Sequence, residues 1–264
     1  MMGAAVRPTD QSSPAILADI LERAQERISR ARGLLIDLDG TLIHAEGPLP
    51  GAREFLARHG HKAIIISNNS SDSAETLRRR LLAADMDIPA SRLVLAGLEA
   101  IAVAAARWPG SRVHMCAAAP LHAAAADAGL VVTEERPDLV IIARDERFDY
   151  AALSAAANAI NRGAIFIATN PDGAHPGPRR QRIPETGALT AAVAAAAGRQ
   201  PHLVVGKPDP ALFRKALGIL GVTAAEAVMI GDNPDTDGRG ADAVAMTACI
   251  VDEHLTLAAL LRPA

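Results

Sequence analysis

Short runs of apolar residues recur along the chain, and a polar cluster follows several of them. Residues 34–36 lead into Asp37-Leu38-Asp39-Gly40, and residues 63–66 lead into Ser67-Asn68-Asn69-Ser70. Apolar runs without alternation are typical of strands buried on both faces, as in a parallel sheet. We predict further strands of this sheet at residues 93–95, 203–205, 227–230 and 248–251.

Segments with helical periodicity separate these runs. Leu77 and Leu81 fall on one face of a predicted helix, and Asp72 and Glu75 stand before it in capping-box spacing. Another helix is expected after Asp209-Pro210. Because strands and helices alternate, the pattern predicts an α/β fold with an open, Rossmann-like parallel-sheet core.

The N-terminal region divides into two parts. Residues 1–13 carry polar residues without periodicity, and we expect a flexible tail there. From Pro14 to about residue 30, Ile16, Ile20 and Ile28 share one face of a predicted helix whose role the sequence leaves open.

The middle of the chain differs in composition. Between residues 99 and 187, predicted alanine-rich helices alternate with short apolar strands. We interpret this segment as a second α/β unit inserted into the first. The predicted core is therefore residues 14–98 plus 188–264, with the insertion at 99–187. The helices are expected at 100–107, 120–128 and 150–161, and the strands at 112–115, 130–132, 139–142 and 164–167.

Composition narrows the class of protein. The formal net charge of -3 disfavours a partner such as nucleic acid or an acidic membrane surface. We expect no membrane span, since no apolar run reaches about 18 residues without a charge. Only two cysteines are present, and the N-terminus lacks a signal-like pattern, so we predict a cytoplasmic protein.

Candidate chemistry gathers at one edge of the predicted sheet. The carboxyl ends of parallel strands meet at the same edge, where α/β proteins bind ligands. Asp37, Asp39, Asp232 and Asp237 would gather there, which is unfavourable unless a cation relieves the repulsion. Carboxylate oxygens suit Mg²⁺. Ser67, Asn68 and Lys207, one of only three lysines, are expected beside them, a combination that favours phosphoryl transfer.

Four segments, in order, resemble the four motifs of the haloacid dehalogenase-type phosphatases. They are residues 37–42, 67–69, 206–208 and 231–237. An insertion between the second and third motifs is similar to the NagD-like subfamily, which has a large α/β cap and includes nucleotide, phosphoglycolate, nitrophenyl-phosphate and pyridoxal-phosphate phosphatases. The resemblance implies a cap at 99–187 and a phosphomonoesterase acting on a small phosphorylated metabolite.

The resemblance also implies a role for each residue of the motifs. Asp37 is the expected nucleophile, which forms a phosphoaspartyl intermediate. Asp39 is expected to protonate the leaving oxygen and then to activate water. Ser67, Asn68 and Lys207 are expected to hold the phosphoryl oxygens. An acid two residues after the nucleophile favours a phosphatase over a dehalogenase, because a halide needs no proton.

The expected cofactor is Mg²⁺. The resemblance assigns it to Asp37, Asp232 and the backbone carbonyl of Asp39, with Asp237 supporting the site from behind. Without the cation, Asp37 would repel the phosphate dianion.

The substrate is left open. His175 lies about where the pyridoxal-phosphate branch has a histidine, since both share Asp-x-x-His-Pro, and Arg179, Arg180 and Arg182 offer charges for a second anionic group. Both features are also consistent with a solvated loop. Glu185 departs from the family pattern, because small residues are common before the Thr186-Gly187 pair.

Two other functions remain open from the sequence. One is phosphotransfer to an acceptor other than water, as in a mutase, and the other is a catalytically silent protein that binds a metabolite. The resemblance further suggests a homodimer, with the cap surfaces as the candidate interface.

Overall fold

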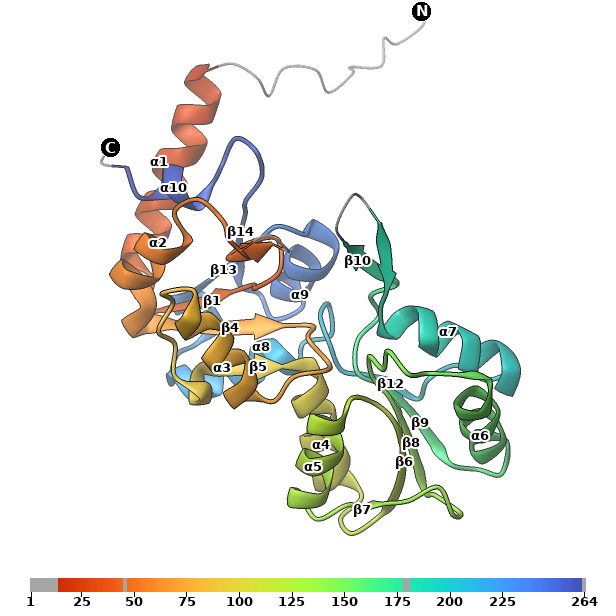
Figure 1. The fold of residues 1–264 in the computed structure, drawn as a ribbon. Coiled ribbons are helices and arrows are strands. Elements are labelled where there is room, and N and C mark those ends of the chain that lie inside the picture. The colour runs from red at the N-terminus through yellow and green to blue at the C-terminus, as the bar shows by residue number, and fades with distance from the viewer. Residues whose placement is uncertain (1–13, 45–46, 178–180, 263–264) are drawn as a thin grey trace, which may run out of the picture.

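The computed structural model describes residues 14–44, 47–177 and 181–262, and it contains two five-stranded parallel sheets (Figure 1). The first sheet has the order β14 (Thr247–Ile250), β13 (Ala227–Gly231), β1 (Gly33–Ile36), β4 (Ala63–Ser67) and β5 (Leu93–Leu95). The predicted tail at 1–13 lies outside the described residues. The predicted α/β class is confirmed, since helices cover both faces of a parallel sheet.

The two faces of the first sheet bury different helices. Leu34 and Ile36 of β1 pack in one cluster with Phe55, whereas Leu35 packs in another with Phe213. This alternation follows from the two-residue period of a strand and explains why the runs are apolar throughout. One face is covered by α1 (Pro14–Arg30), α2 (Ala52–His59), α3 (Ala74–Ala83) and α10 (Leu257–Leu260), and the other by α4 (Ala96–Arg107), α8 (Ala211–Leu220) and α9 (Arg239–Asp242).

The second sheet has the order β12 (Leu203–Val204), β9 (Ile165–Ala168), β8 (Leu139–Ile142), β6 (Arg112–Cys116) and β7 (Val131–Val132). It carries α5 (Ala119–Asp127), α6 (Tyr150–Asn161) and α7 (Thr186–Ala197). We call this sheet with these three helices the second-sheet unit. Alanines of α6 and α7 form part of one buried cluster, so small side chains let these two helices pack closely.

One strand assignment from the sequence is wrong. Residues 203–205 were expected in the first sheet, but Leu203 pairs with Ile167 and Val204 with Ala168 in the second. A short apolar run followed by glycine looks the same in either sheet. Here α7, which precedes β12 along the chain, packs beside α6 and against β8 and β9, so the run follows it into the second sheet. The predicted boundary between 187 and 188 therefore does not follow the sheets, because α7 and β12 stay with the second.

Smaller elements complete the chain. Two antiparallel hairpins were not predicted: β2 (Ile43–His44) with β3 (Gly47–Pro48), and β10 (Ala174–Pro176) with β11 (Arg182–Pro184). The cap of α3 also differs, since the Ser73 side chain, rather than Asp72, accepts from the backbone N–H of Thr76. Within the described ranges, no helix combines the length and apolar character needed to cross a membrane.

Candidate active site

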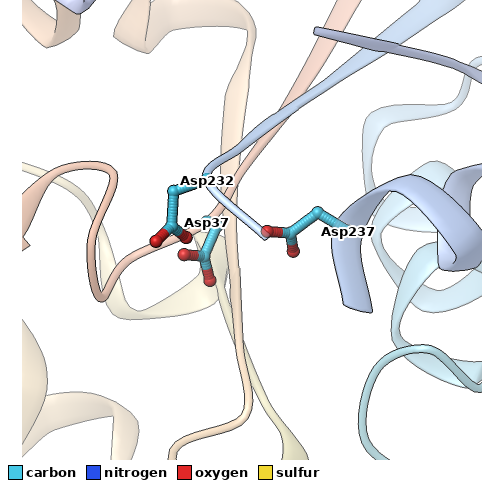
Figure 2. A group of neighbouring side chains, drawn as sticks. All are labelled: Asp37, Asp232 and Asp237. Atoms are coloured by element: carbon cyan, nitrogen blue, oxygen red, sulfur yellow. The ribbon is translucent and has the colours of Figure 1, made fainter. Parts of the chain in front are cut away.

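Three carboxylates converge at the carboxyl end of the first sheet. Asp37 follows β1 and Asp232 follows β13, and these two strands pair in parallel. Asp237 lies in the helical turn after β13. One oxygen from each carboxylate lies within 4.8 Å of the others, and Figure 2 shows the side chains gathered around a common point. The strand tips thus bring together three of the four aspartates that the sequence placed at this edge.

Two glycines let these carboxylates approach the backbone. Gly40 has a φ of 90°, and a Cβ there would lie 2.2 Å from Oδ2 of Asp232. A Cβ at Gly231 would lie 2.2 Å from Oδ2 of Asp237. Any side chain at either position would push a carboxylate out of place.

Gly231→Ala should therefore lower the melting temperature by roughly 3–10 °C, because the added methyl overpacks the buried carboxylate of Asp237. Gly218→Ala is the matched control. In the described structure, a Cβ at Gly218 in the last turn of α8 would meet nothing within 4 Å. This control should raise the melting temperature by roughly 2 °C, because alanine favours the helix. Equal shifts in the two variants, followed by differential scanning fluorimetry, would contradict the argument.

Lys207 supplies the cation that faces these carboxylates. Its Nζ donates to Oδ1 of Asp37 and, at 2.6 Å, to Oδ1 of Asp237. All three side chains are buried. Burial alone would lower the pKa of Lys207, but the carboxylates of Asp37 and Asp237 outweigh it and raise the pKa. Lys207 is therefore a buried ammonium ion held between two carboxylates.

Asp37 lies at the centre of the site. Burial raises its pKa, and the ammonium of Lys207 opposes that rise. Its Oδ2 also accepts a hydrogen bond of 3.3 Å from the hydroxyl of Thr41, a residue of the first motif for which the sequence predicted no role. Both oxygens of the carboxyl therefore have a donor, which orients the group.

Asp39 is exposed and lies close enough to Asp37 to act on the pKa of that carboxyl. Desolvation by the surrounding protein raises the pKa of its carboxyl, while Lys207, Arg80 and His175 act to lower it. The hydroxyl of Ser67, at the end of β4, lies 3.5 Å from Oδ2 of Asp39. A carboxyl whose pKa is raised, next to the carboxyl of Asp37, is suited to hold a proton and to donate it.

The side-chain amide of Asn68, a residue expected to hold phosphoryl oxygens, contacts other parts of the protein. Its Nδ2 donates to Oδ2 of Asp172 at 3.0 Å and to the carbonyl oxygen of Lys207 at 3.1 Å. Both N–H groups of the amide are therefore occupied by the protein. Ser67 and Lys207 point into the site, whereas the amide of Asn68 links neighbouring segments.

His175, on β10, belongs to a separate ionic cluster. Its Nδ1 lies 2.7 Å from Oε1 of Glu185, and Arg144 lies 3.4 Å from the same oxygen. Burial raises the pKa of Glu185, against the influence of Arg144 and His175. His175 nevertheless acts to lower the pKa of Asp39, which indicates that the two side chains lie on the same side of the structure. The unusual Glu185 is thus the partner of the histidine.

The three arginines singled out from the sequence are only partly described. Arg182 is exposed on β11, and Arg179 and Arg180 lie outside the described residues. Sequence analysis missed Arg80, which pairs with Asp72 at 2.7 Å and lowers the pKa of Asp39. The sequence does not single out this arginine, because it is one of three consecutive arginines on the surface of α3.

Comparisons with known proteins agree with this geometry. The profile of haloacid dehalogenase-like hydrolases matches residues 31–244. An acid sugar phosphatase of Staphylococcus aureus is 35% identical over 210 residues, which cover 78% of this chain and 80% of the relative. The glycerol phosphate phosphatase of Mycobacterium tuberculosis, solved in complex with magnesium, is similar with a TM-score of 0.81 and 28% identity over 88% of this chain and 78% of that one.

A further solved structure, NagD of Escherichia coli K-12, is similar with a TM-score of 0.76 and 30% identity, over 84% of this chain and 87% of that chain. The resemblance read from the four motifs is therefore confirmed by both sequence and fold. The chain belongs to the family of haloacid dehalogenase-like hydrolases, and its structural neighbours include the NagD and nitrophenyl-phosphatase members.

Proposed function

We propose that this protein is a Mg²⁺-dependent phosphomonoesterase that acts on a small phosphorylated metabolite. The observation that carries the proposal is the buried ammonium of Lys207 between Asp37 and Asp237, with Asp232 beside them at the strand tips. Relatives named an acid sugar phosphatase and a glycerol phosphate phosphatase support a small, hydroxylated leaving group. The second-sheet unit would serve as the cap over this site.

The residues present fit a magnesium ion. The donors are carboxylate oxygens, the type that Mg²⁺ prefers. Asp37, Asp232 and the backbone carbonyl of Asp39 would hold it. Asp237 would support the site from the second layer, where its Oδ1 accepts from Lys207 and its Oδ2 accepts from the N–H of Asn233. When bound, the ion neutralises the phosphate dianion that approaches Asp37.

The chain's own residues would carry the bond changes. An oxygen of Asp37 attacks phosphorus and forms an aspartyl phosphate, while the bond from phosphorus to the ester oxygen breaks. Asp39 gives its proton to that leaving oxygen. In the second half, Asp39 takes a proton from water, whose oxygen attacks phosphorus and frees Asp37 and phosphate.

The phosphoryl oxygens need hydrogen-bond donors in the site. The ammonium of Lys207, shortly after β12, would supply positive charge, and the hydroxyl of Ser67, at the end of β4, would supply a hydrogen bond. Because the side-chain amide of Asn68 is already used, we assign its contribution to the backbone N–H.

The test is phosphate release from a panel of sugar phosphates, glycerol phosphate and p-nitrophenyl phosphate, each with Mg²⁺ and with EDTA. Turnover should require Mg²⁺, and at least one panel member should be hydrolysed. A panel without Mg²⁺-dependent turnover would overturn the proposal. Products formed with an added sugar acceptor would distinguish hydrolysis from phosphotransfer.

A further inference from the structure

Asp172 joins the two sheets at the active site. It lies four residues beyond β9 of the second sheet, yet its carboxylate accepts from Nδ2 of Asn68, which follows β4 of the first sheet. The same Nδ2 also donates to the backbone carbonyl of Lys207. A single amide thus connects a carboxylate of the second-sheet unit with the main chain of the active-site lysine.

The orientation of this amide follows from its partners. An ionised carboxylate and a carbonyl oxygen are both acceptors, so the NH₂ side must face them. Within the described residues, Oδ1 of Asn68 is buried without a hydrogen-bond donor. A Cβ at Gly206 would lie 2.6 Å from that oxygen. The backbone of Gly206 therefore packs closely against the amide of Asn68 and limits its rotation.

Asp172 itself is firmly anchored. Its backbone N–H donates to Oδ1 of Asn170 at 3.0 Å, and its carbonyl accepts from the N–H of Gly187 at 2.7 Å. The buried Asn170 in turn donates to the carbonyl oxygen of Asn68 at 2.7 Å. Asn170 and Asp172 together therefore hold both the backbone carbonyl and the side-chain amide of Asn68.

We propose that Asp172 is a positioning residue that links the placement of the second-sheet unit to Lys207 through Asn68. The inference rests on the proposed function, in which Lys207 stabilises the transferring phosphoryl group. When Asp172 does not accept its hydrogen bond, the amide of Asn68 is free to turn, and its bond to the main-chain carbonyl of Lys207 is no longer held in direction. A carboxylate would repel a phosphate dianion, so Asp172 is better suited to this link than to direct phosphate binding.

The first test compares Asp172→Ala with Asp172→Asn. The alanine variant should lose about 10- to 100-fold in kcat, because a charge-assisted hydrogen bond is lost, while KM changes less than about threefold. The asparagine variant should stay within about threefold of wild type, because its amide oxygen accepts the same bond. The losses should be equal for p-nitrophenyl phosphate and glycerol phosphate.

Three results would overturn the inference. If kcat is unchanged in Asp172→Ala, the residue has a purely structural role, whether or not the melting temperature of the variant changes. A loss confined to glycerol phosphate would make Asp172 a contact for substrate hydroxyl groups. Equal losses in the alanine and asparagine variants would show that charge, and not the hydrogen bond to Asn68, is what matters.

A double-mutant cycle tests the route through the amide. In an Asn68→Ala background, adding Asp172→Ala should change kcat by less than about twofold, because the link is already broken. Independent, multiplied losses would contradict it. Asp149→Ala is the matched control: Asp149 caps α6 in the same unit, and its variant should keep kcat within about twofold.

A second readout does not depend on turnover. In the NMR spectrum of the wild type, the side-chain amide protons of Asn68 should exchange slowly with solvent. Asp172→Ala should speed their exchange by about tenfold or more, and Asp149→Ala should not. No change in Asp172→Ala would overturn the link. If the substrate panel shows no turnover, the proposed function fails while this measurement still decides whether the link exists.

Discussion

Replacing Asp37 with asparagine should lower kcat for p-nitrophenyl phosphate by at least about 10⁴-fold, because an amide cannot form the aspartyl phosphate. The melting temperature in EDTA should stay at or above that of the wild type. Burial raises the pKa of Asp37, so the folded protein bears a cost for the charge of this carboxyl. The amide oxygen can still accept from Lys207.

The measurement is release of nitrophenolate in Mg²⁺, with melting followed in parallel by circular dichroism. Asp127→Asn is the matched control, since Asp127 is exposed at the end of α5. This control should retain full turnover. Substantial activity in Asp37→Asn would mean that another group attacks phosphorus or that water attacks directly.

Replacing Lys207 with methionine should have the largest effect on stability. In EDTA, the variant should melt roughly 10 °C below the wild type, because removing one partner of a buried ion pair leaves the other charges uncompensated. Asp37 and Asp237 would then face each other without the ammonium. Added Mg²⁺ should recover part of the loss, since the ion supplies positive charge at the same carboxylates. Turnover should fall as well.

Lys215→Met is the control for the change of side chain. Lys215 is about half exposed, and its Nζ lies 3.9 Å from Glu99, so its removal should shift the melting temperature by less than about 2 °C. Thermal melts of both variants, with EDTA and with Mg²⁺, check the prediction. A Lys207→Met loss that is the same in both buffers would contradict the electrostatic explanation.

Much of the fold was predictable because buried parallel strands carry unbroken apolar runs. The runs at 34–36, 63–66 and 139–142 became β1, β4 and β8, and the helix expected at 150–161 is α6 with the same bounds. The sheet to which β12 belongs was not predictable. That choice depends on packing between α6 and α7, which no local pattern encodes.

The candidate site divides in the same way. The sequence pattern predicts Asp37, Ser67 and Asp232, because each is a polar residue close behind an apolar run. The contact between Asn68 and Asp172 spans 104 residues and two sheets, so spacing along the chain carries no trace of it. The homodimer and the cytoplasmic location stay predictions.

The position of β12 has a consequence for exchanging parts between relatives. The chain leaves this edge strand of the second sheet and almost at once reaches Lys207, which lies among the aspartates of the first. A graft that transfers a foreign second-sheet unit must therefore include α7 and β12 but rejoin the host before Gly206. A junction near residue 188 would separate β12 from the rest of the second sheet. A junction at 205 would keep Lys207 and the aspartates that it contacts in the same protein.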